Sequence, residues 1–205
     1  MCAAPGRQRL RAQVSRVSRT RTGSGLPTVF GRKRRQERRF DREATRYQMR
    51  QRMLSIGDDY VIENDHGDRV FRLDGKALRL RKTIRFEDMD GRELYKIQER
   101  MLRIKDSMEI EDPDGNRVAI VKKAMITPLR ERWIVKLEDG PDLHVHGNIV
   151  DHEYKIERDD TTVAEVSKRW FRIRDTYGVE VAPGENDMLV LATAAVLDTM
   201  AHPDR

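Results

Sequence analysis

Three histidines and one aspartate lie within nine residues and come closest in this sequence to a metal-binding group: His144, His146, Asp151 and His152. Imidazoles two residues apart on one face of a strand can share a zinc ion. However, Leu143 and Val145 alternate with the first two histidines and take the core side of that strand, so the histidines face solvent. We therefore predict exposed strand histidines and no metal site.

Basic residues recur near the ends of predicted strands and supply a second candidate chemistry, the binding of phosphate groups. The candidates are Lys122, Lys123, Lys168 and Arg169. If the strands that carry them are equivalent, these side chains gather at one rim of the fold and bind anionic phospholipid headgroups through the local field. The alternative is that they are solvated and paired with the abundant Glu and Asp. Trp170 adjoins one pair, either as a core residue or as an interfacial anchor.

Catalytic signatures are missing from the sequence. It has no Gly-x-Ser-x-Gly motif, no phosphate-binding loop, no dinucleotide fingerprint and no Cys-x-x-Cys pair. Asp112, Asp114 and Asn116 resemble the start of a calcium loop. However, Arg117 stands where that loop needs glycine, and Lys123 stands where it needs the bidentate glutamate. We therefore expect a protein that is not an enzyme and has no cofactor. A hydrolase using the histidines remains an alternative that predicts metal in purified protein.

The net charge of +6 is the sum of two segments of opposite sign. Residues 1–40 contain twelve Lys and Arg and one acid, Glu37, which gives +11 and leaves −5 for the rest of the 205 residues. The first segment has no hydrophobic periodicity, so we predict a basic, disordered tail at 1–44 and a folded domain at 45–205. The tail is open to three interpretations: a targeting segment, an arm that binds nucleic acid or lipid, or a solvated extension upstream of the true start.

The composition also bears on location. The longest apolar run, Met188–Ala201, has 14 residues, fewer than the roughly 20 that a helix needs to cross a bilayer. The lone Cys2 cannot pair within the chain, which suits a reducing compartment. We therefore predict a cytoplasmic protein that is peripheral to a membrane.

Glycines recur at a regular spacing from residue 67 onward. Gly67, Gly91 and Gly115 are 24 residues apart, and Gly140 follows 25 residues later. Each glycine follows acidic turn residues between two alternating segments, which is the pattern of a β-hairpin. This pattern predicts about twelve antiparallel strands: 47–55, 59–63, 68–73, 83–88, 92–99, 106–112, 116–123, 131–138, 142–147, 152–158, 161–168 and 176–181.

The period changes near the C-terminus, where 188–201 is a predicted helix. Its three polar residues, Thr193, Asp198 and Thr199, fall on different sides at 100° per residue, so the helix is apolar all round and should be buried all round. Twelve strands closed into a barrel leave a lumen wide enough for a helix. The predicted fold is mainly β, a closed antiparallel barrel of about twelve strands around a buried C-terminal hydrophobic helix.

Five stretches carry a resemblance to a known family: Met53–Asp59, Phe71–Leu78, Glu93–Glu99, Gly147–Tyr154 and Val166–Asp175. They resemble the LURP-one-related family of the tubby-like superfamily, to which the phospholipid scramblases are related. The resemblance covers nearly all of residues 45–201 and implies a twelve-stranded barrel around a C-terminal helix. Tubby domains bind phosphoinositides and the scramblases act at membranes, so the resemblance also implies a membrane-surface role.

Together these features predict a non-catalytic binding or scaffold domain. Its expected partner is an anionic phospholipid at a membrane surface, or else an unidentified protein. The alternative is a nucleic-acid-associated protein that acts through the Arg-rich tail, by neutralising phosphates with little sequence choice.

Overall fold

The computed structural model describes residues 43–51, 60–78, 81–99, 107–127, 130–170 and 176–202. Twelve strands and a C-terminal helix make up this part of the chain. They are β1 (Thr45–Gln51), β2 (Tyr60–Asn64), β3 (Arg69–Leu78), β4 (Arg81–Asp88), β5 (Glu93–Glu99), β6 (Ser107–Glu111), β7 (Arg117–Thr127), β8 (Arg130–Leu137), β9 (Leu143–Asn148), β10 (Glu153–Arg158), β11 (Thr161–Ser167), β12 (Thr176–Val181) and α2 (Asp187–Ala201).

The strands form a closed antiparallel barrel in which each strand pairs with its neighbours in sequence. Closure comes from β1, where Met49 lies opposite Ile62 of β2 on one side and opposite Tyr177 of β12 on the other. A closed barrel leaves no strand edge open to pair with another chain. The predicted fold class is therefore confirmed, and β1 begins at Thr45. The predicted tail lies outside the described residues except for its last two positions.

The 24-residue spacing arises from a repeated turn and a repeated bulge. Gly67, Gly91 and Gly115 have φ values of 83°, 85° and 84°, in the left-handed region that glycine adopts without strain. The strand pairing also shifts register just after Ile62, Phe86 and Ile110, which are again 24 residues apart. Because the hairpins of an antiparallel meander alternate between the ends of a barrel, these three turns share one end, here called the turn end.

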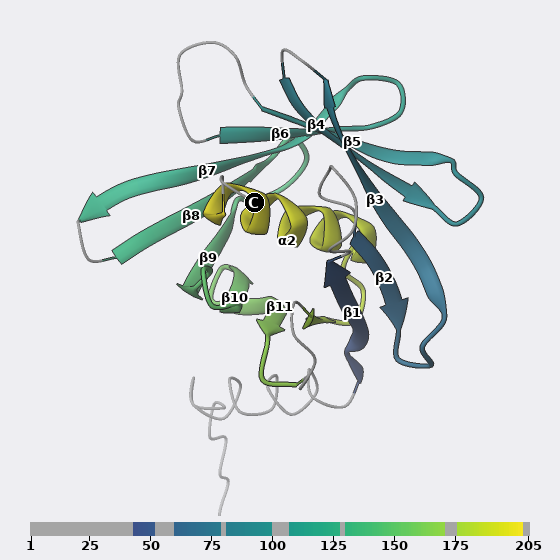
Figure 1. Ribbon diagram of the computed structural model, residues 1–205. Helices are drawn as coiled ribbons and strands as arrows, with labels where there is room; N and C mark the ends of the chain where they lie inside the picture. The colour runs from purple at the N-terminus through teal and green to yellow at the C-terminus, as the bar shows by residue number, and fades with distance from the viewer. Residues whose placement is uncertain are drawn as a thin grey trace, which may run out of the picture.

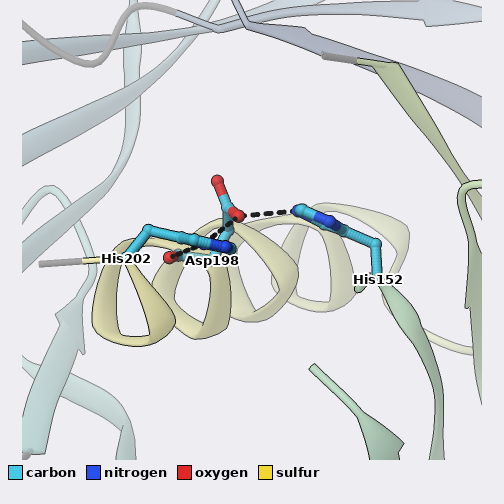
Figure 2. Close-up of side chains that lie close together, drawn as sticks. All are labelled: His152, Asp198 and His202. Atoms are coloured by element: carbon cyan, nitrogen blue, oxygen red, sulfur yellow. Dashed lines mark hydrogen bonds and ion pairs between the residues drawn. The ribbon is translucent and has the colours of Figure 1, made fainter. Parts of the chain in front are cut away.

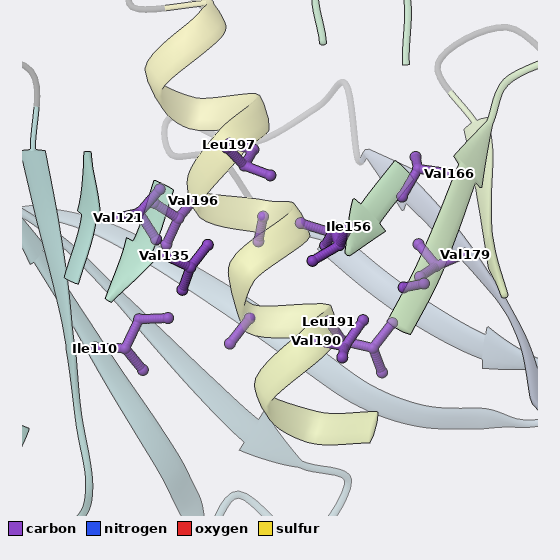
Figure 3. Close-up of a cluster of buried hydrophobic side chains, with 14 of the residues drawn as sticks. Ile110, Val121, Val135, Ile156, Val166, Val179, Val190, Leu191, Val196 and Leu197 are labelled. Carbon is purple, nitrogen blue, oxygen red and sulfur yellow. The ribbon is translucent and has the colours of Figure 1, made fainter. Parts of the chain in front are cut away.

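The helix α2 runs through the barrel (Figure 1). It begins at the turn end, where the Asn186 side chain caps it by accepting a hydrogen bond from the Leu189 backbone N–H at 3.1 Å. Every residue from Val190 to Thr199 is buried, as the all-round apolar pattern predicted. Figure 3 shows Val196 and Leu191 among strand side chains such as Val135 and Ile156. The helix therefore forms the centre of the hydrophobic core.

Among the described residues, no helix is long and apolar enough to cross a membrane.

One strand differs from its predicted bounds in a way that matters for the candidate lipid site. β7 continues to Thr127 and pairs with β8 over this extension, whereas the sequence predicted its end at Lys123. Lys122 and Lys123 interrupt the apolar pattern but do not end the strand, because the backbone pairing with β8 continues beyond them. The two lysines lie in the middle of β7 and not at its end.

Candidate functional site

A group of polar side chains lies inside the apolar barrel, around Asp198 near the end of α2. The Asp198 side chain is only 4% exposed. Its Oδ1 lies 2.6 Å from His152 Nε2 and 3.0 Å from His202 Nδ1, as Figure 2 shows. Its Oδ2 accepts a hydrogen bond from the hydroxyl of Tyr60, at the start of β2. One carboxylate thus joins the helix to two different parts of the barrel wall.

The turn between β9 and β10 places His152 inside the barrel. The His152 backbone N–H donates to the carbonyl of Ile149 at 3.0 Å, and His152 has a φ of 54°, which is uncommon for a residue other than glycine. Gly147 of β9 allows the backbone of β10 to approach closely, because a Cβ at position 147 would lie 2.4 Å from the Glu153 carbonyl oxygen. This local geometry turns the imidazole from the outer face into the core.

The second histidine is positioned by the helix itself. His202 follows Asp198 by four residues, so the two side chains lie on one face of α2. The His202 backbone N–H donates to the Asp198 carbonyl at 3.0 Å and caps the helix C-terminus. The rings of His152 and His202 are stacked with centroids 5.6 Å apart. We refer to His152, Asp198 and His202 as the helix-end triad.

The electrostatics of this region centre on a buried negative charge. Burial raises the pKa of Asp198, but the hydrogen bonds from His152 and Tyr60 and the nearby histidine charges outweigh it and hold the pKa below its ordinary value. Burial, together with repulsion from Asp198, raises the pKa of Tyr154 and of Tyr177 well above the ordinary value. Asp198 is therefore a carboxylate at neutral pH, surrounded by uncharged tyrosines. Such a group can hold a cation or anchor the helix.

The histidines singled out from the sequence are separated by the structure. His144 and His146 lie on the outer face of β9 and are exposed, as the alternation predicted, with ring centroids 6.4 Å apart. His152 belongs to the buried triad instead. No pattern in the sequence marked Asp198 or His202 as partners of His152. A lone acid within an otherwise apolar buried helix was the available signal, because a buried carboxylate needs partners.

The four residues predicted to bind phospholipid fall into two separate pairs. Lys122 and Lys123 point to opposite faces of β7, and Lys123 Nζ lies 5.6 Å from the centre of the Trp133 ring. Lys168 and Arg169 follow β11 and are exposed. In the barrel order, β8, β9 and β10 lie between β7 and β11. The structure therefore does not place the four side chains on neighbouring strands.

Many basic side chains of the outer face pair with acids on adjacent strands. Arg46 and Glu180 approach to 2.6 Å, Arg72 and Glu87 to 2.6 Å, and Lys155 and Glu165 to 3.0 Å. Of the four candidates, Arg169 has an acid nearby, with its Nε 3.5 Å from Glu153 Oε1, but the cross-strand pairs above involve none of the four. The cross-strand pairs reduce the positive charge that the barrel wall presents to an anionic ligand.

Two segments with exposed apolar side chains lie at the end of the barrel where α2 ends. Among the described residues the exposed large hydrophobic side chains are Met89, Val150 and Trp170, at 46%, 52% and 41% exposure. Val150 belongs to the β9–β10 turn, and Trp170 follows β11. The Lys168 backbone N–H joins these two segments by donating to the His152 carbonyl at 3.1 Å. We refer to Val150, Lys168, Arg169 and Trp170 as the Trp170 patch.

Comparison with known proteins identifies the family of this barrel. The sequence model of the LURP-one-related family matches residues 45–198. The chain belongs to the LURP-one-related family. This confirms the resemblance seen in the sequence, and the matched range includes Tyr60, His152 and Asp198. The family match extends over the whole barrel and most of α2.

Two similar proteins agree with this assignment. The uncharacterized protein YxjI of Bacillus subtilis is 22% identical over 156 residues, which are 76% of this chain and 93% of YxjI. A protein from Arabidopsis thaliana, solved by X-ray crystallography, superposes with a TM-score of 0.54 at 17% identity, covering 75% of this chain and 89% of that one. At this identity the plant structure shows a shared fold.

Proposed function

We propose that this LURP-one-related protein is a non-catalytic binding domain that attaches to anionic phospholipid headgroups through the Trp170 patch. The observation that carries the proposal is that two exposed apolar side chains, Val150 and Trp170, lie in hydrogen-bonded segments at the same end of the barrel as the exposed cations Lys168 and Arg169. An indole next to cations is the composition of a membrane-interface anchor, because its ring has an apolar body and a polar N–H.

Because the interior of the barrel is filled, we expect a ligand to bind on its outer surface. The lumen is occupied by α2, whose residues from Val190 to Thr199 are all buried. Small-molecule sites normally need a concave pocket that covers most of the ligand. A surface patch that contacts a lipid layer has no such requirement. We therefore place the ligand on the end of the barrel and assign α2 a structural role.

The expected affinity is weak and sensitive to salt. A basic residue near an anionic membrane contributes about 1 kcal/mol, and this contribution fades within a Debye length. Arg169 contributes less than that, since its Nε also lies 3.5 Å from Glu153 Oε1. Burial of the Trp170 and Val150 side chains in the headgroup region supplies the remaining free energy. Attachment of this kind makes the protein peripheral and reversible on the membrane.

The experiment is sedimentation of the full chain with phosphatidylcholine vesicles that contain a phosphoinositide, at low and high salt. The test variant is Arg169→Ala/Trp170→Ala. Its matched control is Met89→Ala/Arg92→Ala, which also removes one exposed hydrophobic side chain and one arginine. Like Arg169, Arg92 lies near an acid, with its Nε 3.5 Å from Asp88 Oδ2. We expect the test variant to lose binding at low salt and the control to keep it. Equal binding by both variants would rule out the Trp170 patch.

Further variants distinguish the other predicted contacts. Neutralising Lys122 and Lys123 tests the second predicted pair on its own, and we expect a smaller loss because the two side chains point to opposite faces of β7. Deleting residues 1–40 tests the Arg-rich tail, which lies outside the described residues. If the tail deletion alone abolishes binding to vesicles and to DNA, the nucleic-acid alternative replaces the lipid proposal.

A further inference from the structure

The helix-end triad has the composition and spacing of a metal site. Its three potential ligand atoms, His152 Nε2, Asp198 Oδ1 and His202 Nδ1, all lie within 4.8 Å of one another. Two imidazoles and one carboxylate are a donor set that suits divalent transition metals, zinc in particular. We propose that His152, Asp198 and His202 bind a single divalent transition-metal ion at the end of α2. This inference is independent of the proposed attachment to lipid.

The three ligands are held by rigid parts of the fold. His202 caps α2 four residues after Asp198, and His152 is held by the β9–β10 turn, in which its backbone N–H donates to the Ile149 carbonyl. Tyr60 donates to Asp198 Oδ2 and orients the carboxylate so that Oδ1 faces the imidazoles. An outer partner of this kind typically orients a metal-bound carboxylate. The C-terminal end of a helix carries a partial negative charge that further favours a cation.

Without a metal ion, hydrogen bonds hold the two imidazole nitrogens closer to Asp198 Oδ1 than the ligands of a zinc ion lie to one another. Asp198 Oδ1 lies 2.6 Å from His152 Nε2 and 3.0 Å from His202 Nδ1. Ligand atoms about 2.0–2.1 Å from a tetrahedral zinc ion stand roughly 3.3 Å apart, so the 2.6 Å distance must widen by about 0.7 Å and the 3.0 Å distance by about 0.3 Å. Each imidazole nitrogen that coordinates must also carry no proton.

The surroundings of His152 accommodate that change of proton position. Its Nδ1 is buried and has no hydrogen-bond partner among the described residues, so a ring that coordinates through Nε2 carries its proton at Nδ1 and needs a water molecule there as acceptor. The hydroxyls of Tyr154 and Tyr177 are likewise buried without a partner in this part of the chain, and Asp198 acts electrostatically on both. These groups can bond to water molecules that complete the coordination of the ion.

The three proposed ligands differ in their exposure to solvent. The His202 side chain is 12% exposed, whereas those of His152 and Asp198 are 6% and 4% exposed. His202 is therefore the most exposed of the three ligands. For the same reason its replacement removes a ligand without opening the hydrophobic core. Bound metal would tie α2 to the β9–β10 turn, which also carries Val150 of the Trp170 patch.

The experiment is calorimetric titration of the untagged full chain with zinc chloride at neutral pH, after removal of bound metal with a chelator. The test variant is His202→Ala. The control is His144→Ala/His146→Ala, which removes two exposed histidines with ring centroids 6.4 Å apart on the outer face. We expect one zinc ion per chain for the wild type and for the control. We expect at least about tenfold weaker binding for His202→Ala, with circular dichroism unchanged.

A second measurement uses the wild type alone and does not depend on the variants folding. In long-range ¹H–¹⁵N spectra of the imidazole rings, zinc should shift the nitrogens of His152 and His202 and leave those of His144 and His146 unchanged. The proposal is overturned if zinc does not saturate at one ion per chain. It is also overturned if His202→Ala binds as tightly as the wild type, or if the shifted rings are those of His144 and His146.

Discussion

Replacing Tyr60 by Phe tests whether Asp198 anchors the helix to the barrel wall. The substitution removes one hydroxyl and leaves the ring, which is 2% exposed, in place. The lost hydrogen bond goes to a buried carboxylate, and hydrogen bonds to charged groups contribute about 1.5–3 kcal/mol. With a urea dependence of about 2 kcal/mol per molar, the unfolding midpoint should fall by roughly 1 M.

The control is the same substitution at Tyr177. Its ring is 3% exposed and stacks on His152 with centroids 4.3 Å apart. Its hydroxyl is buried without a hydrogen-bond partner among the described residues, so replacement by Phe removes a polar group that gains nothing from burial. We expect Tyr177→Phe to leave the free energy of unfolding unchanged within about 0.5 kcal/mol or to raise it.

The assay is urea unfolding followed by circular dichroism, with equal slopes required for the wild type and both variants. A difference of about 1 M between the two Phe variants would support the bond from Tyr60 to Asp198 as a specific anchor. Midpoints equal to that of the wild type in both variants would refute the reasoning, because the hydroxyl of Tyr60 would then contribute nothing through its bond to Asp198. Equal losses in both variants would show that the hydroxyl of Tyr177 also has a partner.

Three further outcomes follow from the same architecture. Val196→Asp should unfold the domain, because a charge placed at a fully buried position of α2 costs several kcal/mol; a folded, soluble variant by circular dichroism would contradict the central helix. Gly147→Ala should lower the free energy of unfolding in urea by about 1–3 kcal/mol, since Gly147 has a φ of 131° and the new Cβ meets backbone atoms. Gly115→Ala should lower it less, because the space around Gly115 is open. Deleting residues 1–40 should leave the thermal midpoint unchanged, and a fall of several degrees would show that the tail packs on the barrel.

The barrel could be predicted because its signals are local and repeated. Glycine at a positive φ, with acidic turn residues before it, marks the hairpins that begin at Asn64, Asp88 and Asp112. The apolar pattern of α2 then requires a closed space to bury it. The end of β7 was predicted too early, since two consecutive lysines interrupt the alternation while the backbone pairing with β8 continues to Thr127.

The helix-end triad could not be predicted from local patterns. His152 follows a strand whose histidines are exposed, yet it is buried in a turn where its own φ is 54°. Asp198 lies 46 residues further along the chain, so nothing in the neighbourhood of His152 indicates the contact. The one hint in the sequence was an acid, Asp198, within a helix that is otherwise apolar on all sides. Its partners could be named only once the residues facing that part of α2 were known.

The emission of Trp170 on binding vesicles tests the proposed function most directly. The two tryptophans of the chain are distinguishable, because Trp133 is 1% exposed and Trp170 is 41% exposed. With phosphoinositide-containing vesicles at low salt, we predict a blue shift and quenching by brominated lipid, both absent in Trp170→Phe and with pure phosphatidylcholine. An emission spectrum of the wild-type chain that does not change with anionic vesicles at low salt would contradict attachment through the Trp170 patch.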